Sequence, residues 1–210
     1  KKVYNGQPPV TAVNAISFQL NQGAILGLLG PNGSGKTTTI QMLLGTLDKT
    51  SGTITYFGKD FSTHRSEVLQ NVSFASTYTS LPWILTVAEN LEVFGHLYGF
   101  SKKMSYQAFE PLLERFGIKD KKHSRVSSLS AGQVTRLMLV KAFFIDPKIV
   151  LLDEPTASLD PDIANDICTF LLEQRDKRGV SILFTSHKMA EVMQICDRTI
   201  FLKEGEIIAD

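Results

Sequence analysis

Residues 30–38 read G-P-N-G-S-G-K-T-T, and this segment constrains the chain more than any other stretch. It matches G-x-x-x-x-G-K-[ST], a glycine-rich loop whose backbone N–H groups surround phosphate oxygens. The apolar run at residues 24–29 is typical of a buried strand, and residues 39–44 are typical of a helix. A strand, a phosphate-binding loop and a helix in this order predict a chain that binds a nucleoside triphosphate.

Two side chains of the loop have separate tasks in this interpretation. Lys36 brings a positive charge to the β- and γ-phosphates, and Thr37 places a hydroxyl where a Mg²⁺ ion would bind. The predicted triphosphate-contacting residues of the loop are Gly30, Pro31, Asn32, Gly33, Ser34, Gly35, Lys36, Thr37 and Thr38.

The composition is that of an ordinary globular chain and excludes some functions. The 210 residues are 43% hydrophobic and carry a net charge of +1, so no global charge attracts nucleic acid and no specific nucleic-acid partner is expected. The basic cluster at residues 119–125 is expected to be a solvated face. No apolar stretch is long enough to span a bilayer, so a membrane role would require a partner chain.

Two further features concern the cysteines and the ends of the chain. Cys168 and Cys196 lack the spacing of a zinc site or a disulfide framework, so both are expected to pack as small apolar residues. The chain starts at Lys1 rather than Met and stops in what reads as an interrupted hairpin. We therefore expect trimmed ends or a piece of a longer polypeptide.

Hydrophobic periodicity divides the chain into a sheet-forming part and a helical insertion. Residues 15–20 and 53–57 alternate apolar and polar side chains, which predicts half-buried antiparallel strands. From about residue 86 to 116 the period becomes helical. Five side chains are predicted to share one helical face: Val87, Leu91, Phe94, Leu97 and Tyr98.

The second half of the chain reads as a βαβ unit. Residues 148–152 and 180–184 are short apolar runs typical of parallel strands buried on both faces, with a helix predicted at residues 162–176 between them. The first run ends in Asp153, a position where a carboxylate can coordinate Mg²⁺, and Glu154 follows, where a second carboxylate can orient or deprotonate a water molecule. The alternative reading is a polar strand end without catalytic function.

Residues 128–133 open another predicted helix, at residues 134–145. Ser130 fits as the N-cap and Gln133, three residues later, completes a capping box, which would be an adequate structural explanation. Together with the other motifs, however, the chain resembles the ATPase subunits, or nucleotide-binding domains, of ABC transporters. The segment similar to the family signature is Leu129, Ser130, Ala131, Gly132 and Gln133, with Ala131 in place of the usual glycine.

The resemblance covers essentially the whole chain and implies roles for further residues. Asp160 resembles the D-loop acid, His187 the switch histidine, and Tyr4 the aromatic residue that stacks on adenine. One position departs from the pattern: Thr77 stands where the family has a glutamine that contacts Mg²⁺. A threonine has a shorter reach, so metal coordination through Thr77 would require a bridging water.

The resemblance implies an α/β fold, with a P-loop NTPase core, an N-terminal antiparallel β subdomain and an inserted α-helical subdomain. Residues 1–75 and 136–210 would form the core and its β part, and residues 76–135 the helical subdomain with the signature. The implied cofactors are ATP and Mg²⁺. Implied catalytic residues are Glu154, His187 and Lys36, and the implied metal ligands are Thr37 and Asp153, with Thr77 as a further candidate.

The implied assembly is a head-to-tail homodimer in which the signature of one ABC ATPase domain completes the phosphate site of the other. An integral membrane permease is the implied second partner, with the chain peripheral at the cytoplasmic face of the membrane. Residues 85–91 and 94–99 look most like exporter-type ATPases. In one interpretation, residues 78–85 form an exposed groove that receives a helix of the permease. In the alternative, Trp83 and Ile84 belong to the hydrophobic core of the helical subdomain.

Two other functions stay open from the sequence. One is a soluble ABC-type ATPase that acts in translation or DNA maintenance, although such proteins carry paired cassettes or long coiled-coil arms. The other is a nucleotide-binding regulator without turnover, which the presence of Asp153, Glu154 and His187 argues against.

Overall fold

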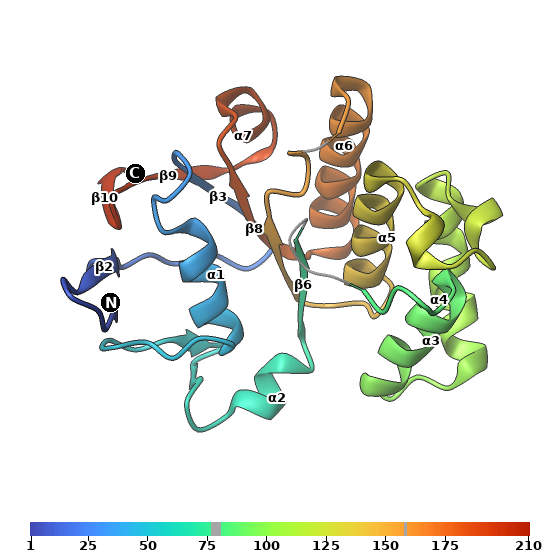
Figure 1. Ribbon diagram of the computed structural model, residues 1–210, viewed down its shortest axis with the longest axis horizontal. Helices are drawn as coiled ribbons and strands as arrows, with labels where there is room; N and C mark the ends of the chain where they lie inside the picture. Colours follow the sequence, from blue (N-terminus) through green and yellow to red (C-terminus); the bar gives the residue numbers. More distant parts are fainter. Residues whose placement is uncertain (77–80, 158) are drawn as a thin grey trace.

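The computed structural model describes residues 1–76, 81–157 and 159–210. Within these residues, the centre of the fold is a six-stranded sheet (Figure 1). Its strand order is β10 (Glu206–Ala209), β9 (Arg198–Lys203), β3 (Ile25–Leu29), β8 (Ser181–Ser186), β7 (Ile149–Asp153) and β6 (Val72–Ser76). The β9–β10 pair is antiparallel and the other neighbours are parallel, so the carboxyl ends of β3, β7 and β8 meet at one edge.

Apolar side chains fill both faces of the sheet because the central strands alternate their side chains between two cores. Ile25, Ile182 and Phe184 belong to the larger core, which they share with helices α5 (Ala131–Phe143), α6 (Pro161–Arg178) and α7 (Met189–Ile195). Leu26 and Leu183 belong to the second core, with helix α1 (Lys36–Leu44). The strands and helices predicted at residues 24–29, 39–44, 134–145, 148–152, 162–176 and 180–184 are therefore confirmed, within a few residues at their ends.

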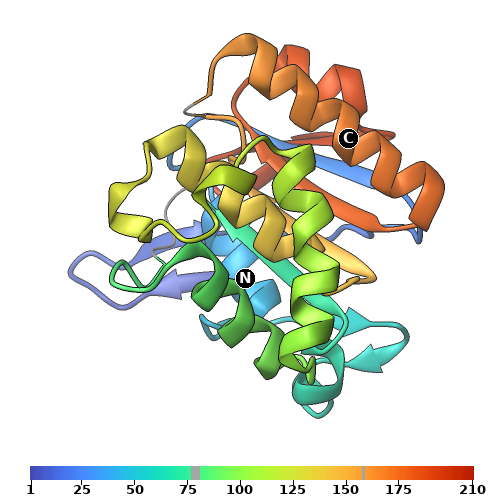
Figure 2. The ribbon, with the colours of Figure 1, turned by 90° about the vertical axis from the view of Figure 1, so that its right-hand side faces the viewer.

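The helical part of the chain lies beside α5, on the side away from α1 (Figures 1 and 2). It contains α3 (Val87–Leu97) and α4 (Lys102–Arg115), followed by two short 3₁₀ helices, Lys119–Lys121 and Val126–Ser128. Thr86 begins α3 as half of a capping box with Glu89, whose backbone N–H lies 3.2 Å from the threonine hydroxyl. The helical period predicted from about residue 86 is therefore confirmed.

The predicted apolar face of α3 needs one correction. Val87 and Leu91 are buried, and Phe94 and Tyr98 pack against the larger core, but Leu97 is 65% exposed. At 100° per residue, Leu97 lies about 80° from Val87 around the helix, at the margin of the buried face. The reading of Trp83 and Ile84 as core residues is also wrong, because they are 62% and 80% exposed.

Two small hairpins accompany the main sheet. One pairs β1 (Lys2–Tyr4) with β2 (Val10–Val13), and the other pairs β4 (Thr55–Tyr56) with β5 (Lys59–Asp60), just before α2 (Arg65–Leu69). The strand predicted at residues 15–20 does not form. Ala15 has a positive φ of 52°, which turns the backbone out of extended geometry. The alternation still reports burial correctly, since Ile16, Phe18 and Leu20 are the half-buried members.

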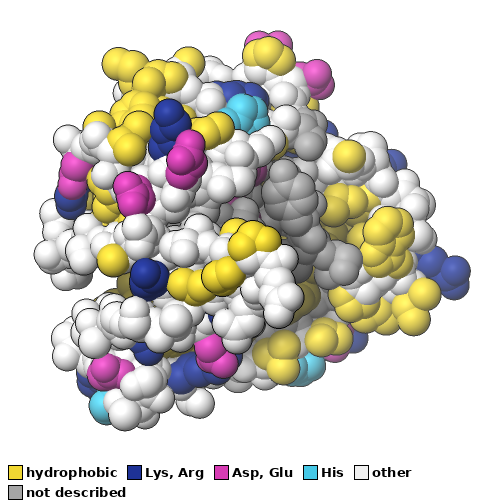
Figure 3. Space-filling view, turned by 60° about the vertical axis from the view of Figure 1, so that its left-hand side comes forward, with side chains coloured by type: hydrophobic (Ala, Val, Ile, Leu, Met, Phe, Trp, Pro, Cys, Tyr) yellow, Lys and Arg dark blue, Asp and Glu magenta, His cyan; other side chains and the backbone are white. Residues whose placement is uncertain are grey.

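The expectations for the two cysteines and for the basic cluster are confirmed, and two observations on the surface and the helices stand beside them. Cys168 and Cys196 are free thiols in apolar surroundings, where burial raises the pKa of Cys168 to about 11. In the basic cluster, Lys119 and Lys122 form ion pairs with Glu114 and Glu110 at the surface. On the face shown in Figure 3, acidic and basic side chains are scattered rather than gathered by sign. Among the helices that the structure describes, none has the length and apolarity needed to cross a membrane.

Candidate functional site

The phosphate-binding loop connects β3 to α1 at the carboxyl edge of the sheet. Gly35 forms the N-cap of α1 with φ 104°, a conformation that L side chains rarely adopt. A Cβ atom at Gly35 would lie 2.6 Å from the carbonyl oxygen of Ala12. The backbone therefore requires glycine here, and α1 begins with its first N–H groups free of intrahelical acceptors.

Two backbone hydrogen bonds brace the loop from outside. The N–H of Gly205, in the turn between β9 and β10, donates to the carbonyl of Ser34 at 3.1 Å. The carbonyl of Gly205 in turn accepts from the N–H of Asn14 at 2.7 Å. The sequence does not reveal this bracing, because only main-chain atoms take part in it.

Lys36 is buried at the centre of the site, with 5% of its surface exposed. Its Nζ donates to the carbonyl oxygens of Gly30 at 2.7 Å and Pro31 at 3.2 Å. It also lies 3.3 Å from Oε1 of Glu154. That oxygen has no hydrogen bond of good geometry, so its contact with Lys36 is an ion pair only.

Thr37 and Asp153 come from different elements and meet directly. The Thr37 hydroxyl donates to Oδ2 of Asp153 at 2.9 Å, and Oδ1 of Asp153 accepts from the Thr185 hydroxyl at 2.8 Å. A hydroxyl and a carboxylate side by side are hard oxygen ligands that suit Mg²⁺. Among the described residues, no group of three or more His, Cys, Asp or Glu side chains forms a metal site, and Thr37 and Asp153 are the two oxygen donors that meet here.

Glu154 is held from three sides in a strained backbone conformation. Its φ is 53°, unusual for a residue with a side chain, and its N–H donates to the Thr185 hydroxyl at 3.0 Å. One carboxylate oxygen faces Lys36, and the other lies 2.8 Å from Nδ1 of His187. Because His187 is exposed while Glu154 is buried, the pair lies where the buried site opens to solvent.

Thr185 is the site residue that the sequence analysis missed. It is completely buried at the end of β8, opposite Asp153 in the parallel register, and one hydroxyl contacts both Asp153 and Glu154. The available signal was its position two residues before His187, at the end of a buried strand next to β7. The hydroxyl fixes which oxygen of Asp153 faces Thr37.

The predicted signature residues lie apart from the phosphate loop. Ser130 is exposed and begins α5 with a capping box, accepting from the Gln133 N–H at 3.3 Å while its own N–H donates to Gln133 Oε1 at 2.9 Å. A Cβ at Gly132 would lie 3.5 Å from Leu159, which precedes Asp160 at the start of α6. Figure 1 places α5 and α1 on opposite sides of the central strands.

The two remaining predicted residues are Tyr4, on the β1–β2 hairpin, and Thr77. Tyr4 is 40% exposed at the end of β1, with Nζ of Lys2 5.1 Å from its ring centroid. It pairs with Val10 at the start of β2, and the other end of β2, at Ala12 and Val13, lies beside Gly35 of the loop. Tyr4 therefore lies on the hairpin that borders the phosphate loop. Thr77, the candidate metal contact, is outside the described residues.

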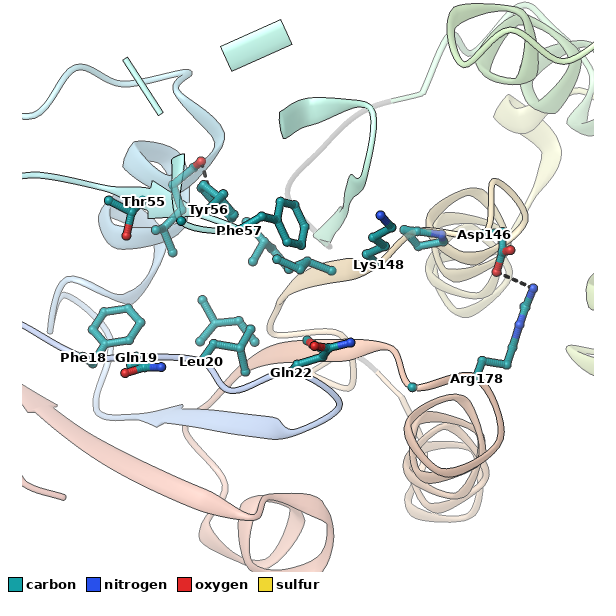
Figure 4. Close-up of a pocket in the computed structure, with 18 residues that line it drawn as sticks. Phe18, Gln19, Leu20, Gln22, Thr55, Tyr56, Phe57, Asp146, Lys148 and Arg178 are labelled. Atoms are coloured by element: carbon teal, nitrogen blue, oxygen red, sulfur yellow. Dashed lines mark hydrogen bonds and ion pairs between the residues drawn. The ribbon is translucent and has the colours of Figure 1, made fainter. Parts of the chain in front are cut away.

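A cavity of about 1030 Å³ is not part of this site (Figure 4). It lies between the β4–β5 hairpin and the opposite edge of the sheet, where it is lined by Phe57, Lys148, Ile149 and Ser181. Ile149 and Ser181 begin β7 and β8, whereas the phosphate loop and Asp153 lie at the carboxyl edge. Ligands of open parallel sheets bind at the carboxyl edge, where the predicted site residues gather. The cavity lies at the other edge and is therefore separate from the candidate site.

Comparison with known proteins finds relatives that match most of the chain. The family model described as ABC transporter matches residues 13–157. The chain is 39% identical over 198 residues to the Nod factor export ATP-binding protein I of Burkholderia lata, covering 94% of this chain and 65% of the relative. It is 36% identical to the ABC transporter ATP-binding protein NatA of Bacillus subtilis, covering 95% of this chain and 81% of that one.

A solved structure extends the likeness to three dimensions. The cbiO1 protein of Clostridium perfringens, part of the ABC transporter complex cbiONQ, superposes with a TM-score of 0.83 at 26% identity, covering 99% of this chain and 84% of that one. The predicted α/β fold, with a P-loop NTPase core, an N-terminal antiparallel β part and an inserted α-helical part, is confirmed. The sequence match spans more than half of the chain, and the chain belongs to the ABC transporter family, as one of its ATP-binding cassettes.

Proposed function

We propose that this chain binds and hydrolyses ATP with Mg²⁺, that two copies close head-to-tail over the nucleotide, and that this closure drives export through a membrane permease. The observation that carries the proposal is the connected set of Lys36, Thr37, Asp153, Glu154 and His187 at the carboxyl edge of the sheet. Because the chain spans 65% of the length of relatives such as the Nod factor export protein, the activity of the whole protein belongs to this proposal.

The residues of the set divide the work of phosphoryl transfer. Lys36 and the first N–H groups of α1 bind the phosphates and stabilise the charge that develops on them. Thr37 and Asp153 would hold Mg²⁺, which would supply positive charge to neutralise the phosphates. Glu154 orients a water molecule and accepts its proton, while His187 keeps the Glu154 carboxylate in place and contacts the γ-phosphate. Tyr4, on the hairpin beside the loop, stacks on the adenine ring.

The position of the signature residues supports the need for a second copy of the chain. Ser130 is exposed at the start of α5, and Figure 1 places that helix across the sheet from α1. A helix start with an exposed hydroxyl is suited to binding a phosphate. Because one chain would have to fold onto itself to bring Ser130 to its own Lys36, a second copy supplies Ser130, with Asp160 beside the shared interface.

The permease partner is supported by the surface of the helical part and by the relatives. We assign residues 76–135 to a helical subdomain, and residues 1–75 and 136–210 to the core with its β part. Trp83 and Ile84 are exposed apolar side chains beside α3, where a membrane partner can dock. Relatives named as export or transporter proteins favour transport over a role in translation or DNA maintenance. The chain then lies peripherally at the cytoplasmic face of the membrane.

The test of this function is the substitution Glu154→Gln in the purified protein. We expect normal binding of a fluorescent ATP analogue, at least about hundredfold slower phosphate release, and an ATP-dependent dimer in size-exclusion chromatography. The amide keeps the size of the side chain but cannot accept a proton. Glu173→Gln, at a half-buried glutamate of α6 that pairs with Lys177, is the matched control. Wild-type turnover in Glu154→Gln would remove Glu154 from the role of base.

A further inference from the structure

We propose that Glu191 is a positioning residue that ties the loop carrying His187 to the segment after Glu154, so that the two move as one unit. The proposal rests on the function proposed above, because it concerns the same site. Glu191 lies in the first turn of α7 and is 8% exposed. Burying a charged carboxylate costs free energy unless hydrogen-bond donors compensate for it. The donors to Glu191 therefore show which segments it connects.

Three side chains donate to the Glu191 carboxylate. Oε2 accepts from the Thr156 hydroxyl at 2.6 Å and from the Ser186 hydroxyl at 3.1 Å. Oε1 lies 3.0 Å from Nζ of Lys188. Thr156 follows β7, whereas Ser186 and Lys188 flank His187 at the end of β8, so one carboxylate joins the ends of two neighbouring strands.

The contacts close into a ring rather than a chain. Nζ of Lys188 also donates to the carbonyl oxygen of Thr156 at 3.2 Å, and the Lys188 N–H donates to the Ser186 hydroxyl at 3.0 Å. Thr156 and Ser186 are each 1% exposed. Removing the carboxylate would leave two buried hydroxyls without their acceptor, and water has little access to replace it.

The residues of the ring lie next to two groups that have roles in the proposed mechanism. His187, between Ser186 and Lys188, lies 2.8 Å from the carboxylate of Glu154. Thr156 begins the segment that leads to Leu159, which lies against Gly132 of the signature in the same chain. Glu191 therefore links the residues that orient water with the residues offered to the second copy.

The ring is separate from the groups that bind the nucleotide. The hydrogen-bond and ion-pair partners of Glu191 among the described residues are Thr156, Ser186 and Lys188. None of them belongs to the phosphate loop or to the Thr37–Asp153 pair. A change at Glu191 is therefore expected to affect turnover and cooperativity rather than the binding of ATP.

The experiment compares Glu191→Ala and Glu191→Gln with the wild type, using the purified protein and Mg-ATP. We expect Glu191→Ala to lower kcat at least about tenfold and to lower the Hill coefficient, with the dissociation constant of a fluorescent ATP analogue within about twofold of wild type. Glu191→Gln keeps an oxygen that can accept from Thr156 and Ser186, so it should recover kcat to within about threefold of wild type. Glu173→Ala is the control for losing a glutamate from a helix near the site.

A second variant tests whether the bond to Thr156 carries the effect. Thr156→Val removes the hydroxyl and keeps the shape, and it should not lower kcat further when combined with Glu191→Ala, because both changes break one connection. Hydrogen exchange gives a readout that does not depend on turnover. Amides of residues 156–157 and 186–188 should exchange faster in Glu191→Ala, while those of residues 36–44 keep wild-type protection.

The outcomes separate this inference from the proposed function. Wild-type kcat and unchanged exchange in Glu191→Ala would overturn the positioning role while leaving the ATPase intact. Loss of analogue binding together with kcat would also overturn it, because it would indicate a general structural role. A wild-type protein that neither binds nor hydrolyses ATP would overturn the proposed function itself, and the exchange measurement would still decide whether Glu191 joins the two segments.

Discussion

Two glycines of the phosphate loop have positive φ for different reasons. Gly35 has φ 104°, and a Cβ there would lie 2.6 Å from the main-chain oxygen of Ala12. Gly33 has φ 82°, but a Cβ there would meet no atom within 4 Å. A side chain at Gly33 costs backbone strain alone, whereas a side chain at Gly35 would also push β2 away from the loop.

The two alanine variants therefore differ in a predictable way. We expect Gly35→Ala to lower the free energy of unfolding by about 3 kcal/mol or more and to abolish ATP binding, whereas Gly33→Ala costs about 1 kcal/mol. Denaturant unfolding and titration with a fluorescent ATP analogue measure both quantities. Equal losses at the two positions would contradict the assignment of the Ala12 contact.

The site residues that the sequence predicted are those whose spacing is fixed by a local motif. Lys36 and Thr37 follow from the loop pattern, and Asp153 and Glu154 follow from the end of an apolar strand. Thr185 could not be predicted in the same way, because its role depends on the parallel register that places it opposite Asp153. A threonine at a strand end has many possible uses, and only the neighbouring strand decides among them.

Elements were predictable where side-chain burial determined them. The apolar runs that became β3, β7 and β8 are buried on both faces, so their sequences carry a strong signal. Residues 15–20 alternate equally well, yet no strand forms there in the described structure. Alternation reports which side chains face the core, whereas a strand also needs a neighbour whose backbone pairs with it.

Helix α5 contains a half-buried lysine, Lys141, whose ammonium lies over an aromatic ring of α3. Nζ of Lys141 lies 4.9 Å from the ring centroid of Phe94, and burial lowers the pKa of Lys141 to about 8. In the unfolded chain this pKa is near 10.5. Between these two values the unfolded state binds more protons than the folded state, so stability contributed through this group rises with pH in that window.

The substitution Lys141→Met tests this assignment. Below pH 8 the wild type carries the cost of a buried charge, and the cost is relieved as the lysine loses its proton. We expect the free energy of unfolding of wild type relative to Lys141→Met to increase by about 2–3 kcal/mol between pH 7 and pH 10. Urea unfolding at each pH measures it, and Lys103→Met, at an exposed lysine of α4, is the control. A pH-independent difference would refute the lowered pKa.

At the scale of the whole molecule, the proposed active site is divided between two copies. Lys36 belongs to α1 and Ser130 to α5, and these helices lie on opposite sides of the central strands (Figure 1). A head-to-tail pair therefore contains two sites, each with Lys36 from one copy and Ser130 from the other. Defects at the two residues should complement each other when the copies are mixed.

Mixing Lys36→Ala with Ser130→Asp measures this complementation. Aspartate still caps a helix, but its charge repels the γ-phosphate. Each variant alone should be inactive, whereas an equal mixture should reach about a quarter of the wild-type rate, because about half of the pairs are mixed and each contains one intact site. A mixture as inactive as its components would indicate that each chain uses its own Ser130.

The capping box at Ser130 also limits how the position can change. The Ser130 hydroxyl oxygen accepts from Gln133 to start α5, and its hydrogen stays available for the phosphate oxygen that we propose Ser130 binds in the other copy. Threonine can serve both uses, whereas alanine loses both together. An alanine scan would therefore report fraying of a helix and loss of a ligand contact as a single number. Substitution tolerance at this position measures two selective pressures at once, and only paired threonine and aspartate variants can separate them.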